Sequence, residues 1–234
     1  MFWEENDNKV GFDVDDSVVD LLFSLECREL PVDHIQPLSA AIRQALDHDD
    51  ELLSAIAINP IHLAGSQNGW ERPDPSLGQN LILSKRTKLV LRDKKQQQKS
   101  IIEKLQDRTL NIEGFELTLR KPKVRKLSKD GTVFSRAIVC EENETEDEAA
   151  FLKRMQKELA LKGIVIRKAL CGKTSSFQTD QGEIHTRSLM LAEIPPELSV
   201  KLQQEGVGEH QHFGCGIFIP HKGIAAVGES TDDE

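Results

Sequence analysis

The sequence contains no tyrosine, and aromatic residues make up only 5% of its 234 positions. Single-domain RNA-recognition modules stack bases on aromatic side chains of their central strands, so this scarcity argues against that mode of binding. The four cysteines are far apart and form no C-x-x-C pair, which excludes a zinc ribbon and a disulfide framework. Neither a basic signal segment nor an apolar run of membrane-spanning length is present. We therefore expect a cytoplasmic protein without a membrane partner.

Negative charge predominates in the whole chain but not in its middle. The formal net charge is −9, and residues 1–20 contain seven acids against one base. Residues 85–129, in contrast, contain 15 Lys or Arg and 5 Asp or Glu, and residues 120–126 alone hold five bases. A local excess of this size predicts a surface that binds a polyanion such as a nucleic acid. Lysines also blunt exposed sheet edges, which is the simpler explanation of the same residues.

Hydrophobic periodicity predicts two units with the same order of elements. In the first unit we expect strands at 18–25, 55–63 and 80–92, and a pair of strands within 109–121. We expect helices at 34–46 and 94–106. In the second unit we expect strands at 132–140, 164–172, 183–194 and 216–220, with helices at 146–163 and 195–206. Two β-α-β-β-α-β units in tandem predict an α+β protein with two ferredoxin-like (RRM-like) domains. The expected division is a disordered acidic N-terminus at 1–16, an N-terminal domain at 17–121, a basic linker at 122–131, a C-terminal domain at 132–224 and an acidic tail at 225–234.

A glycine-rich loop precedes the last predicted strand, in the sequence GVGEHQHFGCGIFIPHKG (206–223). Its order of helix, loop and strand is the reverse of a dinucleotide-binding motif. Gly214 and Gly216 would let backbone N–H groups approach a phosphate, flanked by His212 and Lys222, and the same glycines suit a tight turn or a bulge. The histidines and the cysteine of this loop match no closed zinc pattern, so we expect no metal.

His34 stands at the mouth of the first predicted helix, directly after Asp33, whose side chain we expect to cap that helix. Histidine is suited to proton transfer near neutral pH, and helix N-termini attract phosphate. On the residues alone, a catalytic histidine and an ordinary surface histidine at a helix start are equally consistent with this position.

Three segments together resemble the CRISPR repeat-processing endoribonucleases of the RAMP superfamily, in the subtype first described from Myxococcus. They are VDLLFSLECRELPVDHIQPLSAAI (19–42), LILSKRTKLVLR (81–92) and the glycine-rich segment, and the resemblance covers about residues 18–224. It implies a metal-independent cut of a CRISPR repeat RNA on the 3′ side of a stem-loop. The ribose 2′-hydroxyl attacks the adjacent phosphate and leaves a 2′,3′-cyclic phosphate and a 5′-hydroxyl. Such enzymes commonly stay on the guide RNA within a type I interference complex, which in some lineages is coupled to transposition.

The resemblance also implies roles for single residues. His34 corresponds to the catalytic histidine of the family, whereas Gln36 stands where many relatives have a tyrosine, which leaves Arg43 or His212 to orient the phosphate. No cofactor is implied. We expect the repeat RNA to contact basic residues of the middle segment and the glycine-rich loop, namely Lys85, Arg86, Lys88, Arg92, Arg120, Lys121, Lys123, Arg125, Lys126, His212, Gly214, Gly216 and Lys222. The alternatives are a non-catalytic RNA-binding subunit of the same complex and an acidic scaffold protein that binds no RNA.

Overall fold

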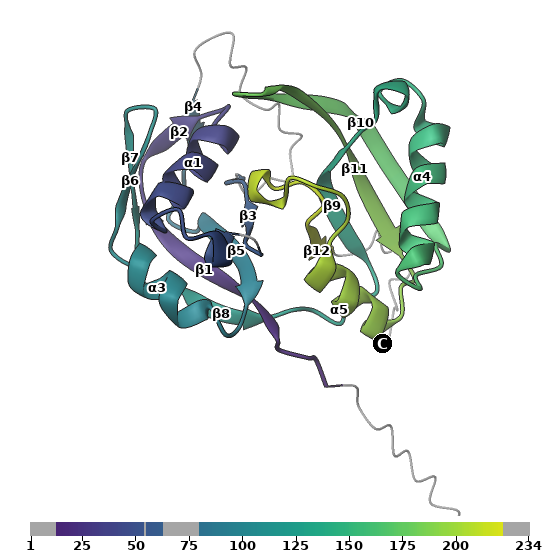
Figure 1. Ribbon diagram of the computed structural model, residues 1–234, viewed down its shortest axis with the longest axis horizontal. Coiled ribbons are helices and arrows are strands. Elements are labelled where there is room, and N and C mark those ends of the chain that lie inside the picture. The colour runs from purple at the N-terminus through teal and green to yellow at the C-terminus, as the bar shows by residue number, and fades with distance from the viewer. Residues whose placement is uncertain (1–12, 54, 63–79, 222–234) are drawn as a thin grey trace, which may run out of the picture.

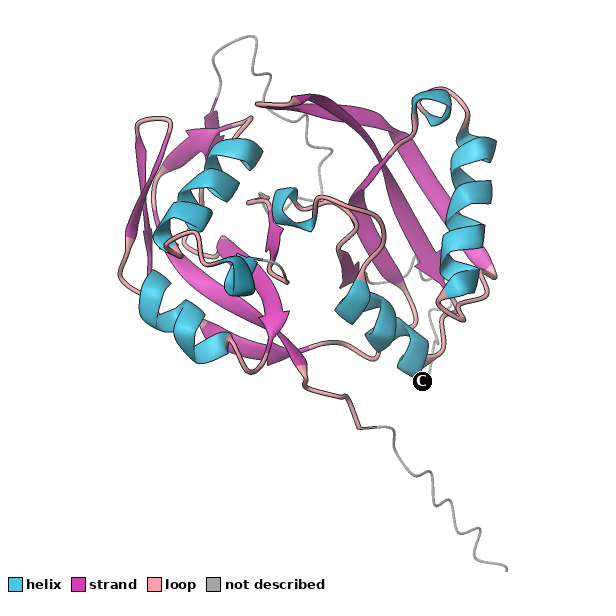
Figure 2. Cartoon of the chain, viewed as in Figure 1, coloured by secondary structure: helices cyan, strands magenta, loops and turns pink. Residues whose placement is uncertain are grey.

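The chain forms two halves, each a β-sheet with helices against it, in a computed structural model that describes residues 13–53, 55–62 and 80–221 (Figure 1). Helices and strands alternate through both halves, so the α+β class predicted from the sequence is confirmed (Figure 2). No helix within these ranges is long and apolar enough to cross a membrane.

The first half extends through residue 126. Its elements are β1 (Val18–Glu26), β2 (Glu29–Pro31), α1 (Ile35–Ala45), α2 (Asp50–Leu53), β3 (Ala57–Asn59), β4 (Asn80–Ile82), β5 (Lys88–Lys94), α3 (Gln98–Leu105), β6 (Thr109–Ile112), β7 (Phe115–Leu119) and β8 (Lys123–Lys126). The strand order of its sheet is β3-β5-β1-β7-β6, with β8 also paired to β1, and every pairing is antiparallel. The short strands β2 and β4 form a separate ribbon.

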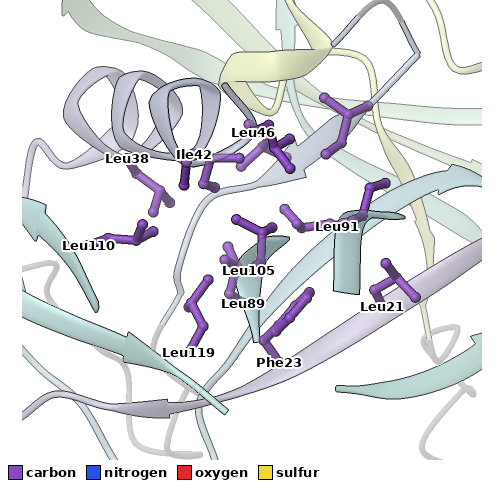
Figure 3. Packing of buried hydrophobic residues seen from close by; sticks show 14 of the residues in the cluster. Leu21, Phe23, Leu38, Ile42, Leu46, Leu89, Leu91, Leu105, Leu110 and Leu119 are labelled. Atoms are coloured by element: carbon purple, nitrogen blue, oxygen red, sulfur yellow. The ribbon is translucent and has the colours of Figure 1, made fainter. Parts of the chain in front are cut away.

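The core of the first half lies between its sheet and the helices α1 and α3. Alternation along β1 turns Leu21 and Phe23 inward, and both are fully buried. They belong to one cluster with Leu38 and Ile42 of α1 and Leu105 of α3 (Figure 3). Burial of each such side chain contributes about 1.5–3 kcal/mol, which is why the apolar stripe of α1 decides how this helix lies.

The second half has the order strand, helix, two strands, helix, strand. Its elements are β9 (Val133–Val139), a 3-10 turn η2 (Glu142–Glu144), α4 (Glu148–Leu161), β10 (Lys168–Thr179), β11 (Gly182–Ala192), α5 (Pro196–Glu205), a second 3-10 turn η3 (Gln211–Phe213) and β12 (Phe218–Pro220). The sheet has the order β10-β11-β9-β12. Phe151 and Met155 of α4 pack against Leu189 and Leu191 of β11, so α4 covers the face of this sheet that points away from the first half (Figure 1).

Two predicted strands differ from the observed ones because local turns were missed. The strand expected at 80–92 is broken at Ser84–Thr87, where the Thr87 N–H donates to the Ser84 carbonyl at 3.0 Å and the Thr87 hydroxyl accepts from the Ser84 N–H at 3.2 Å. The strand expected at 164–172 begins at Lys168 instead and continues to Thr179, as half of a long hairpin with β11.

The predicted linker and acidic N-terminus also need correction. The linker segment 122–131 contains β8, which extends the first sheet. Residues 13–16 are ordered: Asp15 accepts hydrogen bonds from Ser17, and Asp16 pairs with Lys95 at 2.6 Å. Residues 1–12 and the tail at 225–234 lie outside the described residues. Asp33 makes no capping hydrogen bond, because α1 starts one residue later, with His34 in the N-cap position.

Arg92 of β5 joins the two halves. Its guanidinium donates to both carboxylate oxygens of Asp20, at 2.8 and 3.3 Å, within the first half. The same group donates to the carbonyls of Gln203 and Phe218 in the second half, at 2.8 and 2.7 Å. Because Arg92 is 3% exposed and Asp20 1% exposed, these bonds are shielded from water and fix how the halves meet.

Candidate active site and RNA-binding surface

A pocket opens between α1, the turn from β10 to β11, and η3 in the glycine-rich loop. Polar and charged side chains from all three segments line it, among them Gln36, Arg43, His48, Asp180, His210 and His212. Ser39 of α1 lines it as well: this residue is 1% exposed, and its hydroxyl has no hydrogen-bond partner among the described residues.

Backbone hydrogen bonds hold the two loop histidines in place. His210 adopts a left-handed φ of +63°, and its carbonyl accepts from the N–H groups of Phe213 and Cys215 at 2.8 and 3.2 Å. This turn brings the rings of His210 and His212 to 5.7 Å between centroids. The Phe213 ring packs against both, at 5.9 and 4.1 Å. Two imidazoles therefore line the pocket on a backbone that is held internally.

His212 shares this pocket with a cation, Arg43. Burial, and then the charges of His210 and Arg43, lower the pKa of His212 below its usual value of 6.5. A histidine with a lowered pKa is neutral at pH 7, which is the form that accepts a proton. The Arg43 side chain is half-buried and makes no hydrogen bond or ion pair with the described residues. A proton acceptor beside an unpaired cation is an arrangement suited to phosphodiester cleavage.

His34, the residue that the resemblance implies is catalytic, lies in the interior, and its catalytic role stays a prediction. This side chain is 2% exposed. Its Nδ1 lies 3.0 Å from the Pro31 carbonyl, and its Nε2 accepts the Ile61 N–H at 3.0 Å. Because Nε2 accepts from a backbone amide, Nδ1 carries the proton, and both ring nitrogens have backbone partners. His34 joins the start of α1 to the chain beyond β3.

The structure contradicts a direct phosphate contact by Gly214 and Gly216. Both are buried, and their N–H groups donate to the carbonyls of Gln211 and Ala137, at 3.0 and 2.7 Å. Their φ angles are +87° and +68°, in the region that favours glycine. A Cβ at Gly214 would collide with Pro60, beyond β3, so this glycine permits the loop of the second half to pack against the first half.

Two of the basic residues expected to bind RNA are engaged within the protein. Arg92 is the buried residue that joins the halves, and a guanidinium held by four hydrogen bonds cannot also bind phosphate, so that expectation is wrong. Lys88 is half-buried and donates to the Ser24 hydroxyl at 2.8 Å.

Three further basic residues lie on the surface and pair with carboxylates. Arg120 forms two ion pairs, at 2.6 and 3.0 Å. Arg125 pairs with the buried Asp20 at 2.9 Å, and Lys126 approaches Asp16 at 3.8 Å. The pairs of Arg120 and Lys126, whose carboxylates are exposed, are worth about 0–1 kcal/mol, so a phosphate could displace those carboxylates.

Four of the expected basic residues are exposed and unpaired in the described part of the chain. They are Lys85 and Arg86, in the turn between β4 and β5, and Lys121 and Lys123, at the start of β8. Lys222 lies outside the described residues. The basic residues therefore fall into three groups: those hydrogen-bonded within the protein, those in surface ion pairs, and those exposed without a partner among the described residues. Counting charges in the sequence does not distinguish these groups.

Sequence reasoning missed His48 and His210 as partners of His212 in one pocket. His48 follows α1 with a φ of +54°, and its N–H donates to the Arg43 carbonyl at 3.1 Å, so the chain turns back at the helix end and His48 stays at the pocket. A histidine next to the end of a helix is a weak signal in a sequence. What brings His48 and His210 together is the contact of α1 with η3, which joins the two halves.

Solved structures share this fold. A Cas6-related protein from Pyrococcus furiosus matches with a TM-score of 0.60 at 14% identity, covering 86% of this chain and 97% of that chain. A CRISPR associated protein Cas6 gives 0.57 at 12% identity, with 88% and 99% covered. A RAMP protein binding different RNA substrates also gives 0.57, at 17% identity, with 88% and 98% covered. The fold is therefore that of the Cas6 and RAMP class of proteins.

The sequence comparison is more specific. A family model described as Cas6 Crispr matches residues 19–223. The chain belongs to the Cas6 family of CRISPR-associated endonucleases, as the resemblance of its three segments indicated. The CRISPR-associated endonuclease Cas6 of Myxococcus xanthus (strain DK1622) is 25% identical over 202 residues, which cover 86% of this chain and 81% of that protein.

Proposed function

We propose that this chain is a metal-independent endoribonuclease that cleaves precursor CRISPR RNA within its repeats and so produces guide RNA. The observation that carries the proposal is the pocket in which His212 lies near Arg43 and His210. Membership of the Cas6 family supports the substrate class. We propose His212 as the proton-transfer group in place of His34, whose ring nitrogens are both engaged.

The proposed reaction is an in-line attack of a ribose 2′-hydroxyl on the adjacent phosphate. Neutral His212 accepts the hydroxyl proton, and the guanidinium of Arg43 stabilises the negative charge that develops on the phosphate oxygens. The leaving 5′-oxygen takes a proton from a second group, for which His210 is the nearest imidazole. The products are a 2′,3′-cyclic phosphate and a 5′-hydroxyl. Because the chain supplies a base, an acid and a cation, this mechanism requires no metal.

The proposal includes how the RNA is held. The second half has the strand order and crossover helices of a ferredoxin-like domain, and we propose that the two halves are tandem domains of that type. The unpaired cations Lys85, Arg86, Lys121 and Lys123 would neutralise phosphates of the repeat stem-loop. We further propose that the protein acts in the cytoplasm and remains with the guide RNA as a subunit of a type I interference complex.

Single-turnover cleavage of a repeat RNA in EDTA tests the assignment of His212. His212→Ala should slow cleavage by about 100-fold to 10,000-fold, the range typical of a general acid or base, while affinity for an uncleavable RNA with a 2′-deoxyribose at the cut site stays within about twofold. His185→Ala is the matched control, because His185 is half-exposed on β11 and outside the pocket. Tight binding by the wild-type protein without any cleavage would instead favour a non-catalytic RNA-binding subunit.

The pH dependence gives a second readout. A base whose pKa lies below 6.5 is deprotonated at pH 7, so the cleavage rate should stay constant near neutral pH and fall as the pH decreases through the pKa of His212. Arg43 and His48 at α1, Asp180 from the β10–β11 turn, and His210 on the loop line the same pocket. Of these groups, His210 and Arg43 lower that pKa. An Arg43→Gln variant should raise it and move the fall in rate to higher pH. A rate that is unchanged by His212→Ala would overturn the assignment.

A further inference from the structure

The open face of the second sheet carries a row of apolar side chains that its core does not use. Leu170, Met190, Phe134 and Ile219 are direct cross-strand neighbours on β10, β11, β9 and β12. None of the four belongs to the cluster under α4. Leu170 is 61% exposed, and the other three are half-buried. The face of the second sheet away from α4 therefore carries an apolar row that includes the Phe134 ring.

A cation is held over that ring. The register of β9 against β11 shifts between Leu189 and Arg187, and this irregularity falls at Arg136 and Ala137 of β9. The Arg136 guanidinium lies 5.8 Å from the centroid of the Phe134 ring. Among the described residues it makes no hydrogen bond and no ion pair, although burial lowers its pKa. Arg136 as a whole residue is exposed, so its guanidinium is open to a ligand that supplies negative charge.

His221 completes the edge of this arrangement. Its ring meets Phe134 edge-on, at 5.6 Å between centroids and 61° between planes. The His221 Nδ1 is buried and has no hydrogen-bond partner among the described residues. The Phe134 ring is therefore bordered by the His221 ring and by an exposed guanidinium, a group that bonds to phosphates and stacks on bases.

The row is continuous with the candidate active site. Arg136 and Ile219 line a cleft between the two halves, together with Phe177 and Phe213. The Phe213 ring also lines the pocket that contains His212. Arg136 links this cleft to the Phe134 ring, because its guanidinium lies 5.8 Å from the ring centroid.

We propose that Phe134 and Arg136 form a binding site for an unpaired nucleotide of the RNA substrate, with the base on the Phe134 ring and its phosphate at Arg136. The site rests on the proposed function, since it lengthens the path of the same RNA. Bases stack on aromatic rings and on guanidinium planes, and this combination is sequence-tolerant. An apolar protein partner fits less well, because it would bury Arg136 without neutralising it.

Binding of two uncleavable probes to the full chain tests this site. One probe is the complete repeat RNA with its single-stranded flanks and the other is the stem-loop alone, each with a 2′-deoxyribose at the cut site. Phe134→Leu removes the ring but keeps an apolar side chain, and Arg136→Gln removes the charge. Each should weaken binding of the complete repeat about 5-fold to 100-fold and leave stem-loop binding unchanged. Leu161→Ser and Lys157→Ala, on the α4 layer, are matched controls expected to change neither.

An abasic scan of the flanks locates the contact. At the position that stacks on Phe134, removal of the base should weaken RNA binding by the wild-type protein as much as Phe134→Leu does. It should not weaken RNA binding by the Phe134→Leu variant any further. If both variants bind the complete repeat normally while the wild-type protein binds and cleaves it, the site is overturned and the proposed function stands. A loss confined to association with another protein subunit would also overturn it. Failure of the wild-type protein to bind any repeat RNA would overturn the proposed function itself.

Discussion

At the scale of single residues, the chemistry of a side chain is decided by what surrounds it. His34 and His212 have the same ring but different surroundings. His34 donates one hydrogen bond and accepts another in the interior, whereas His212 lines an open pocket together with Arg43. The imidazole nitrogens of His34 satisfy the Pro31 carbonyl and the N–H of the buried residue Ile61. Its contribution therefore belongs to stability, because buried backbone groups left without partners are costly.

His34→Ala should lower the free energy of unfolding by about 3 kcal/mol, because it leaves the Ile61 N–H buried without a partner and opens a small cavity. Urea unfolding measures the loss. Well below its unfolding transition the variant should cleave repeat RNA at close to the wild-type rate. A variant that unfolds like the wild type but cleaves a hundredfold more slowly would restore His34 as the proton-transfer group.

At the scale of elements, the glycine-rich loop is built to pack as well as to turn. Gly206, Gly208, Gly214 and Gly216 all have positive φ, but they differ in what lies next to them. Gly214 faces Pro60 of the first half, and Gly216 faces the Val207 carbonyl, whereas nothing lies within 4 Å of a Cβ added at Gly208. Substitution of Gly208 would therefore introduce backbone strain alone, whereas substitution of Gly214 would add a steric collision.

Gly214→Ala should destabilise the protein by about 2 kcal/mol or more beyond the effect of Gly208→Ala. Both variants pay the cost of an alanine in the left-handed region, about 1 kcal/mol, but only Gly214→Ala must push Pro60 aside. Thermal unfolding of the two variants measures the difference. Because η3 carries His210 and His212, Gly214→Ala should also slow cleavage. Equal stabilities of the two variants would mean that the loop does not press against the first half.

At the scale of the whole molecule, the candidate site exists only where the halves meet. Arg43 and His48 come from the first half, and His210 and His212 come from the second. The buried guanidinium of Arg92 fixes that meeting through bonds to Asp20 on one side and to two carbonyls on the other. A rigid junction holds the proposed catalytic groups of the two halves in a fixed relative position. Correct positioning of reacting groups accounts for much of an enzyme's rate increase.

Arg92→Met should cost about 3–5 kcal/mol, because it leaves Asp20 buried with one partner and frees two carbonyls of the second half. The halves should then loosen, which small-angle scattering would record as a larger radius of gyration. Arg125→Ala is the control: it removes the other partner of Asp20, but Arg125 is half-exposed and makes no bond across the halves, so a loss below about 1 kcal/mol is expected. Equal effects of the two variants would rule out a junction role for Arg92.

The sequence by itself determined the order of the elements and the placement of the charges. The helices expected at 34–46, 94–106, 146–163 and 195–206 correspond to α1, α3, α4 and α5, because apolar side chains at helical spacing and the Pro and Gly residues at helix ends act locally. The Cas6 resemblance was readable for the same reason, since its motifs are short stretches of adjacent residues. The break in the strand at 84–87 was not predicted, because side-chain hydrogen bonds of Ser84 and Thr87 favour a turn inside an apolar run.

Only the tertiary structure decided which polar residues are buried and which remain free. Arg92 and Arg86 are both basic residues of one segment, yet Arg92 is sealed between the halves and Arg86 is exposed. Phe134 belongs to a chain with few aromatic residues, but the pairing of four strands brings it to the centre of an open face. Burial and partnership depend on contacts between residues far apart in the chain, and no local pattern encodes them.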